Sequence, residues 1–304
     1  MKNTLSVIND NVVRDANGFI RECENRFDSQ VEKTVERILE NPGCDIVLLA
    51  GPSSSGKTTT AGKIAEKIRR TGKNAYTVSL DDFYLNRDEI PMGEDGMQDF
   101  ETVEALDIEL IHKVFASLIN DRHADLPIFD FTTGTRKNEP KHIELGSDDV
   151  IVVEGLHALN PVITSGLDET HVFRVYISVS TRVFSDDGKV LLNKRNLRLA
   201  RRIIRDAKHR NMTAEDTLSR WNSVRQGEDK YLFPYESNAD VKIDSFHPYE
   251  PCMFRGSVIA QLDTVEEDSV FYKKACELRY AYSSAEIISL NLLPDDSLLQ
   301  EFLT

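Results

Sequence analysis

The sequence predicts an α/β fold in which a mostly parallel sheet is flanked by helices. The first observation is a pair of continuous apolar runs, 46–50 and 150–153, which have the composition of strands buried on both faces. The second is that stretches with apolar residues at helical spacing separate the predicted strands. The third is a glycine-rich loop, Gly51–Thr58, directly after the first run. Strand, loop and helix in this order predict a ligand site at the carboxyl ends of the strands.

The composition limits the class of protein. The chain has 304 residues, 40% of them hydrophobic, which suits one large α/β domain with extensions or two small domains. A formal net charge of −14 argues against general binding to nucleic acid or to an anionic membrane. The four cysteines form no C-x-x-C pair, and no apolar run approaches the about 18 residues of a membrane span. We therefore expect a cytoplasmic protein with no nucleic-acid or membrane partner.

A helix is predicted ahead of the first strand and another after the glycine-rich loop. The first begins at a capping-box pattern, Ser29-x-x-Glu32, and closes at Pro42-Gly43. The second begins in the loop and ends before Gly72. Their apolar stripes consist of Val31, Val35, Ile38 and Leu39, and of Ala61, Ile64, Ala65 and Ile68.

The remaining strands of the sheet follow in chain order. A strand over 75–80 ends at Asp81-Asp82, and the run 150–153 ends at Glu154-Gly155. Between them a helix is predicted from about Val103, with an apolar face of Leu110, Ile111, Val114, Phe115 and Leu118. Because apolar and polar residues alternate in them, two segments are predicted as strands nearer a sheet edge: 172–179 and 239–244.

These elements divide the chain into three parts. Residues 1–44 form an N-terminal helical extension, residues 45–245 form the α/β domain, and residues 246–304 form a C-terminal extension. In the last part, apolar spacing predicts a helix around Phe271 to Leu278 and a short one around Leu298 to Leu303. We expect this extension to pack on the α/β domain or at a dimer interface, because a helix with one apolar stripe usually buries it.

The loop Gly51–Thr58 has the spacing of a phosphate-binding loop. Its glycines let backbone N–H groups face inward, Lys57 can reach the outer phosphates, and the Thr58 hydroxyl can hold Mg²⁺. A flexible serine and glycine linker is the alternative, but the flanking strand and helix favour a P-loop NTPase fold. The residues expected to bind the nucleotide here are Gly51, Ser53, Ser54, Ser55, Gly56, Lys57, Thr58 and Thr59.

Two carboxylates follow neighbouring strands. Asp81 comes after the second strand and Glu154 after the long apolar run. A carboxylate at such a strand end is placed for Mg²⁺ or for an attacking hydroxyl, so Thr58, Asp81 and Glu154 are the predicted metal ligands. The alternative for Asp81 is a helix cap or turn, and Asp82 competes with it one residue away.

A basic segment, residues 194–210, reverses the charge of this acidic chain locally. Arg198, Arg202 and Arg205 fall at i, i+4 and i+7 and so share one helix face. A solvated basic helix is the alternative. We favour an arginine-rich lid that closes over a triphosphate, because phosphoryl transfer spreads negative charge that guanidinium groups stabilise.

Taken together, these motifs resemble the uridine kinase and phosphoribulokinase family of P-loop kinases over roughly residues 45–245. The phosphate loop comes first, and Val153-Glu154-Gly155 is similar to the family's metal-holding strand end. The other matching segments are Asp81-Asp82-Phe83-Tyr84, Pro127-Ile128-Phe129-Asp130-Phe131 followed by Arg136, and Arg201-Arg202-Ile203-Ile204-Arg205-Asp206.

The resemblance implies a role for each matching position. Asp81 would take the proton of the acceptor hydroxyl, and Lys57, Arg205 and Arg210 would hold phosphates. Glu101 matches an aspartate that binds ribose hydroxyls in uridine kinases. The acceptor site would consist of Tyr84, Glu101, Phe129, Phe131, Arg136 and Arg202, although Phe129 and Phe131 are also candidates for the core.

The departures from the family pattern all fall on base recognition. Gly134 stands where uridine kinases place a base-contacting histidine, Met212 replaces an expected arginine, and Arg220 replaces a base-reading glutamine. A lost buried hydrogen bond can change substrate preference by orders of magnitude. The phosphoryl-transfer motifs are intact.

The sequence therefore predicts a Mg²⁺-dependent kinase that moves the γ-phosphoryl group of ATP or GTP to a hydroxyl, foremost the 5′-hydroxyl of a nucleoside such as uridine or cytidine. A kinase of another sugar or small hydroxyl compound, as in the phosphoribulokinase branch, is the alternative. A nucleotide-dependent regulatory NTPase is a third reading, but Asn193-Lys194-Arg195-Asn196 lacks the Asn-Lys-x-Asp pattern that reads guanine.

Overall fold

The structure is a computed structural model that describes residues 3–93, 96 and 98–303. Within these residues the largest sheet has five strands in the order β11-β8-β1-β7-β2, and all of its pairings are parallel. Its strands are β1 (Ile46–Ala50), β2 (Ala75–Ser79), β7 (Val150–Glu154), β8 (Val172–Ser178) and β11 (Val241–Asp244). The predicted parallel sheet is confirmed, with β1 at its centre.

Helices and three small antiparallel pairs surround the sheet. The helices are α1 (Leu5–Leu39), α2 (Lys57–Arg69), α3 (Ile108–Asn120), α4 (Lys194–His209), α5 (Ala214–Tyr231), α6 (Glu250–Leu262), α7 (Tyr272–Ser283) and α8 (Gln300–Leu303). The pairs join β3 (His123–Leu126) to β6 (Lys141–Glu144), β4 (Phe129–Asp130) to β5 (Thr135–Arg136), and β9 (Val183–Phe184) to β10 (Val190–Leu192). None of the described helices has the length and apolar character that crossing a bilayer requires.

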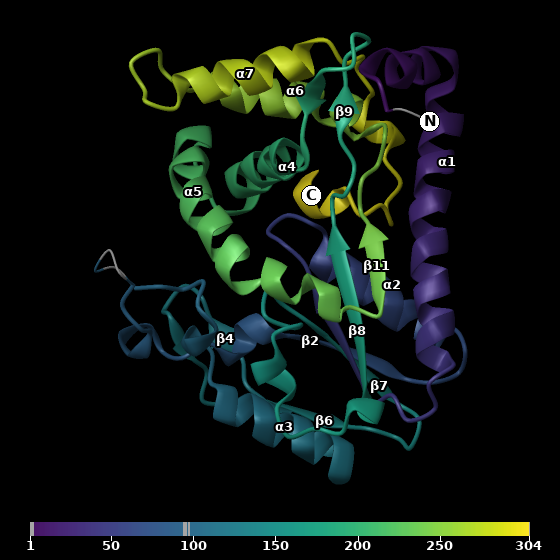
Figure 1. Cartoon of the computed structure of the whole chain (residues 1–304), viewed down its shortest axis with the longest axis vertical. Coiled ribbons are helices and arrows are strands. Elements are labelled where there is room, and N and C mark those ends of the chain that lie inside the picture. The colour runs from purple at the N-terminus through teal and green to yellow at the C-terminus, as the bar shows by residue number, and fades with distance from the viewer. Residues whose placement is uncertain (1–2, 94–95, 97, 304) are drawn as a thin grey trace.

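Each face of the sheet borders its own hydrophobic core. Successive side chains of β1 point to opposite faces, so Val47 and Leu49 enter one core while Ile46, Leu48 and Ala50 enter the other. The first core also contains buried residues of α1, α2, α4, α6, α7 and α8. The second contains α3. Both terminal regions therefore pack on the same side as the phosphate-loop helix α2, and α1 runs along one edge of the molecule (Figure 1).

Helix α1 is much longer than predicted, and Ser29 lies inside it instead of capping it. The apolar stripe continues backwards through Phe27, Ile20 and Ile8, and all three are buried. At Asp15 the backbone is extended, with φ −162° and ψ 87°, and its carboxylate accepts the N–H of Gly18 at 2.9 Å. Asp15 thus interrupts the helix and caps the part that follows it.

The two segments predicted as strands nearer a sheet edge are neighbours at one end of the sheet: β11 is an edge strand and β8 lies between it and β1, while β2 forms the other edge. Another prediction needs correction. The helix expected from about Val103 begins at Ile108, because Asp107 caps it by accepting the N–H of Leu110 at 2.9 Å. The sequence of helix α6 shows no helical periodicity of apolar residues, because the helix is apolar on several sides and largely buried.

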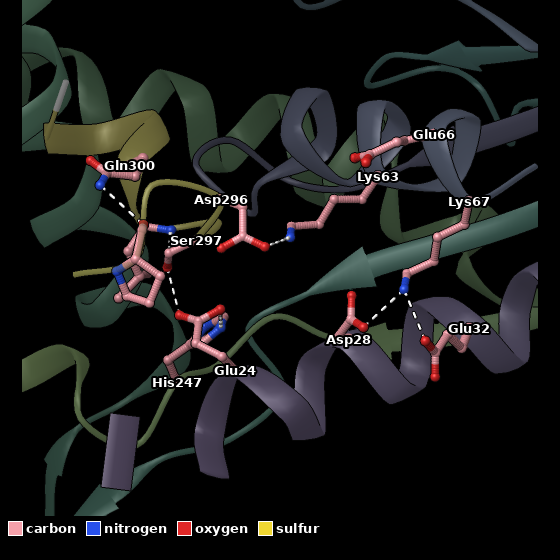
Figure 2. Close-up of polar contacts among 12 residues, drawn as sticks. Glu24, Asp28, Glu32, Lys63, Glu66, Lys67, His247, Asp296, Ser297 and Gln300 are labelled. Carbon is pink, nitrogen blue, oxygen red and sulfur yellow. Dashed lines mark hydrogen bonds and ion pairs between the residues drawn. The ribbon is translucent and has the colours of Figure 1, made fainter. Parts of the chain in front are cut away.

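A buried polar cluster joins α1 to the C-terminal region (Figure 2). The Glu24 carboxylate accepts hydrogen bonds from Ser297 Oγ at 2.6 Å and from the Tyr249 hydroxyl. The ring of His247 lies 3.6 Å away. Burial alone would raise the pKa of Glu24, but these hydrogen bonds and the His247 charge outweigh it and lower the pKa to about 2.

This cluster predicts a loss of stability in acid. A depressed carboxyl pKa stabilises the folded state above the ordinary value near 4.5, and this stabilisation disappears as the pH falls towards 2. The shift corresponds to roughly 3 kcal/mol. In urea unfolding, Glu24→Gln should flatten the fall of the unfolding free energy between these pH values. The exposed Glu22 on the same helix is the control: Glu22→Gln should keep the wild-type slope, and equal slopes in both variants would contradict the assignment.

Candidate active site

The phosphate loop leaves β1 at the centre of the sheet and leads into α2. Gly56 adopts φ +90°, a left-handed conformation that favours glycine, directly before the helix. At Gly51 a Cβ atom would collide with the carbonyl oxygen of Ile177, so the loop passes close to β8. Among the described residues, the Ser54 and Ser55 hydroxyls are buried without a hydrogen-bond partner. Polar groups left unpaired in such a loop are available to phosphate oxygens.

A buried ion pair holds the first part of this loop. Arg198 of α4 makes two hydrogen bonds to Glu228 of α5, at 2.6 and 2.8 Å, and donates to the carbonyl oxygen of Ser53 at 3.0 Å. The same Glu228 carboxylate accepts the N–H of Ser53 at 2.8 Å. Arg198 was expected on the face turned to the triphosphate, but it is only 2% exposed and is committed to this pair. Its role is to fix the loop.

A second buried ion pair holds the next residue of the loop. Arg201 contacts both oxygens of Glu250 at 2.7 Å and donates to the carbonyl oxygens of Ser54 at 3.3 Å and Ser245 at 2.8 Å. The side chains of Arg201 and Glu250 are fully buried. Since Glu250 begins α6, a residue of the C-terminal region helps to shape the phosphate loop.

Three further arginines of this region surround one buried carboxylate, that of Asp206. Arg205 donates to it at 2.8 Å, Arg202 at 3.1 Å, and Arg210 lies 3.4 Å from it. Arg202 also donates to the Ser53 hydroxyl at 2.8 Å. Asp206 therefore gathers three guanidinium groups beside the phosphate loop, as a site for a polyphosphate requires.

The two predicted carboxylates lie at neighbouring strand ends. Glu154 at the end of β7 accepts hydrogen bonds from Thr58 Oγ1 at 3.2 Å and Ser79 Oγ at 3.1 Å. Burial raises the pKa of Glu154 to about 7, with Lys57 lowering it and Asp81 adding to the rise. Desolvation by the surrounding protein also raises the pKa of Asp81, and the Lys57 charge opposes this shift. The Lys57 charge thus acts on both carboxylates, and Asp81 acts on Glu154.

This donor set suits Mg²⁺. The Thr58 hydroxyl contacts Glu154, and Asp81 is close enough to raise the pKa of Glu154, so hard oxygen ligands gather at one point. Asp81 raises the pKa of Glu154, and a cation between two such carboxylates stabilises their charged forms. Thr58, Asp81 and Glu154 are therefore the residues that fit the metal.

Asp82 is separated from this site by its own contact. Its carboxylate accepts the N–H of Phe129 at 3.2 Å, which ties the turn after β2 to strand β4. Among the described residues, Asp81 has no such side-chain contact across the fold, and its backbone N–H donates to Ser79 Oγ at 3.3 Å. The structure therefore distinguishes the two neighbouring aspartates.

The predicted aromatic residues of the acceptor site do gather. The ring centroids of Phe129 and Phe131 are 5.1 Å apart, and Tyr84 lies 5.8 Å from Phe129. Phe131 is 60% exposed, so it is not a core residue. Arg136 differs from its expected role, because its guanidinium group donates to the carbonyl oxygens of Phe83 and Tyr84 and to Asp107. It holds the Tyr84 backbone in place.

Glu101 lies against helix α5. A Cβ atom at Gly227 would lie 2.6 Å from the Cβ atom of Glu101, so the absence of a side chain there lets Glu101 approach the helix. The Tyr231 hydroxyl donates to Asp99 at 3.1 Å and ties the same segment to α5. Burial raises the pKa of Glu101 to about 7, while the nearby Arg202 lowers it. Glu101 and Arg202 therefore lie on the same side of the site.

Sequence reasoning missed the acidic partners of the loop-fixing arginines, Glu228 and Glu250. Nothing in their local sequence separates them from surface glutamates. The only hint was the excess of arginine on α4, since two of these side chains lie on the apolar side of the helix, where a charge needs a partner. Gly134 stands at a position where uridine kinases place a base-contacting histidine. In this chain it occupies the turn between β4 and β5 with φ +72°.

Breaking the second ion pair should destabilise the protein strongly. Glu250→Gln leaves the fully buried charge of Arg201 without its counter-ion, and we expect a loss of about 3–5 kcal/mol in unfolding free energy measured with urea. The matched control is Asp229→Asn on α5, because Asp229 pairs with Arg195 of the same helix α4 at 2.6 Å on the surface. That variant should lose less than about 1 kcal/mol. Similar small losses in both would contradict the anchoring role.

Comparison with known proteins identifies the family of this chain. The family model described as "Phosphoribulokinase / Uridine kinase family" matches residues 46–249. A uridine kinase from Bacillus pumilus is 29% identical to this chain over 199 residues, which cover 65% of this chain and 85% of that protein. A uridine kinase from Ureaplasma parvum is 26% identical over 201 residues, which cover 65% of this chain and 86% of that protein. A structure described as a putative fructose transport system kinase from a Silicibacter species has a TM-score of 0.51 at 18% identity, over 70% of this chain and 98% of that one, which supports the fold. Since the family model spans well over half of its residues, the chain belongs to the phosphoribulokinase and uridine kinase family and is a phosphotransferase that acts on a hydroxyl acceptor.

Proposed function

We propose that this kinase transfers the γ-phosphoryl group of ATP or GTP, with Mg²⁺, to the 5′-hydroxyl of a nucleoside such as uridine or cytidine. The observation that carries the proposal is the convergence of Thr58, Glu154, Asp81 and Lys57 beside the arginines held by Asp206. Such a site supplies positioning and charge stabilisation, which make up most of the catalysis of phosphoryl transfer.

Each group has a distinct role in this proposal. Lys57, Arg205 and Arg210 bind the phosphates and offset the charge that develops on the transferred group. Thr58, Asp81 and Glu154 hold Mg²⁺, which adds further charge neutralisation when bound. Asp81 accepts the proton of the acceptor hydroxyl as a general base.

The nucleoside part of the proposal rests on the acceptor side. Glu101 occupies the position that resembles the ribose-binding aspartate, and the aromatic rings of Tyr84, Phe129 and Phe131 gather as walls for a flat base. The similar proteins from Bacillus pumilus and Ureaplasma parvum are named uridine kinases. The Arg202 charge acts on Glu101, so both groups are candidates for contacts with the hydroxyls of the acceptor.

The neighbouring aspartates provide a sharp test of the proton acceptor. Asp81→Asn should lower kcat by about a hundredfold or more, because the amide cannot take the proton, while ADP affinity measured by calorimetry changes little. Asp82→Asn removes the same charge one residue away but keeps an oxygen that accepts the Phe129 N–H. We expect that variant to retain most of its turnover. The assignment is wrong if Asp82→Asn loses turnover and Asp81→Asn does not.

The acceptor is tested with purified protein, labelled ATP and a panel of nucleosides and sugar phosphates. We expect uridine or cytidine to give the highest kcat/KM. Phosphorylation of sugar or other small hydroxyl compounds alone would support the second candidate, which positions 134, 212 and 220 favour because they lack the family's base-reading groups. Hydrolysis of ATP without any acceptor would contradict both.

A further inference from the structure

The C-terminal segment 297–303 lies on the phosphate loop. Leu298 packs directly against Gly56, where a Cβ atom would lie 2.5 Å from Leu298 Cδ1. Three residues later, Glu301 Oε2 accepts hydrogen bonds from Thr59 Oγ1 at 2.7 Å and from the Thr59 backbone N–H at 3.3 Å. Figure 1 shows this segment's helix α8 beside α4, near the carboxyl ends of the strands.

Thr59 is one of the groups that should receive the nucleotide. Its N–H lies in the first turn of α2, where backbone donors have no partner within the helix and the helix dipole favours an anion. In a phosphate-binding loop these N–H groups cradle the phosphates next to the nucleoside end of the donor. The Glu301 carboxylate is an anion that now occupies this position.

We propose that Glu301 is a built-in competitor of the nucleotide donor, an inference that rests on the proposed function. The carboxylate must leave Thr59 before a phosphate oxygen can take the same hydrogen bonds. Once displaced, it still lies near the phosphates and repels them. The apparent affinity for the donor is therefore the intrinsic affinity multiplied by the fraction of molecules in which Glu301 has left Thr59.

The residues around Glu301 are tightly packed, so only the Glu301 side chain has to move when the nucleotide binds. Leu298, Leu299 and Phe302 are fully buried, and Phe302 lies under the Arg201 guanidinium at 5.2 Å. Lys208 of α4 donates to the carbonyl oxygen of Leu303. These contacts keep the segment docked, so the donor displaces the carboxylate by a change of rotamer and not by unfolding α8.

The residues just before Leu298 also hold the segment in place, through contacts with α1 and α2. Ser297 donates to Glu24 of α1 at 2.6 Å, and Asp296 lies 3.6 Å from Lys63 Nζ of α2 (Figure 2). Residues 296–303 lie outside the part of the chain that matches the family model, which ends at residue 249. Glu301 therefore lies in the C-terminal part of this chain, which extends beyond the region matched by the family model.

The test compares Glu301→Gln with Asp296→Asn by titration calorimetry with ADP and Mg²⁺. Glu301→Gln removes the charge but keeps an oxygen that can accept from Thr59, and we expect it to bind ADP about tenfold more tightly than wild type. Asp296→Asn makes the same charge change five residues away, at a side chain that is 86% exposed. It should change the affinity by less than about twofold.

Steady-state kinetics provide a second readout. Glu301→Gln should lower the KM for ATP and leave the KM for the acceptor unchanged, and Glu301→Ala should shift the ATP value in the same direction. If wild type and Glu301→Gln bind ADP equally well, or the variant binds more weakly, the competitor is excluded while the proposed function stands. If neither protein binds ADP at all, the proposed function fails and this inference with it.

Discussion

The phosphate loop depends on two buried arginine–carboxylate pairs. Arg198 with Glu228 and Arg201 with Glu250 each direct a guanidinium N–H at a loop carbonyl oxygen, that of Ser53 or Ser54. A guanidinium can make two hydrogen bonds to its carboxylate and still reach the backbone, which lysine cannot do with the same geometry. The loop thereby has its shape before any phosphate arrives, and such preorganisation lowers the cost of binding.

These two buried pairs explain why the arginines of α4 have different roles. Those on the inner side of the helix are buried and structural, whereas Arg202 and Arg205 lie around Asp206 and remain partly accessible. One helix therefore both fixes the loop and places positive charge beside it. The same helix contacts α6 and α8, so the C-terminal region is part of the support of the site.

Parts of the fold could be predicted from the sequence because local signals and tertiary packing agree there. Strands β1 and β7 are buried on both faces and therefore appear as continuous apolar runs. The loop between β1 and α2 is recognised by the spacing of its glycines, Lys57 and Thr58. The beginning of α1 could not be placed, since a capping-box pattern at Ser29 competes with an apolar stripe that continues past it. That Asp81 and Glu154 lie near the phosphate loop could be predicted because strand ends of a parallel sheet meet at one edge, whereas their role as metal ligands stays a prediction. The partners of the arginines could not, because 30 residues separate Arg198 from Glu228 and 49 separate Arg201 from Glu250.

The contact between Thr59 and Glu301 spans 242 residues of sequence. During synthesis the phosphate-loop helix leaves the ribosome long before the segment that later packs against it, and α6 with its loop-fixing glutamate also follows late. The central strands can pair earlier, but the loop lacks its supports until these distant residues emerge. Nucleotide added to a nascent chain would thus meet an unfinished pocket, and contacts of such high sequence separation are the slowest to form.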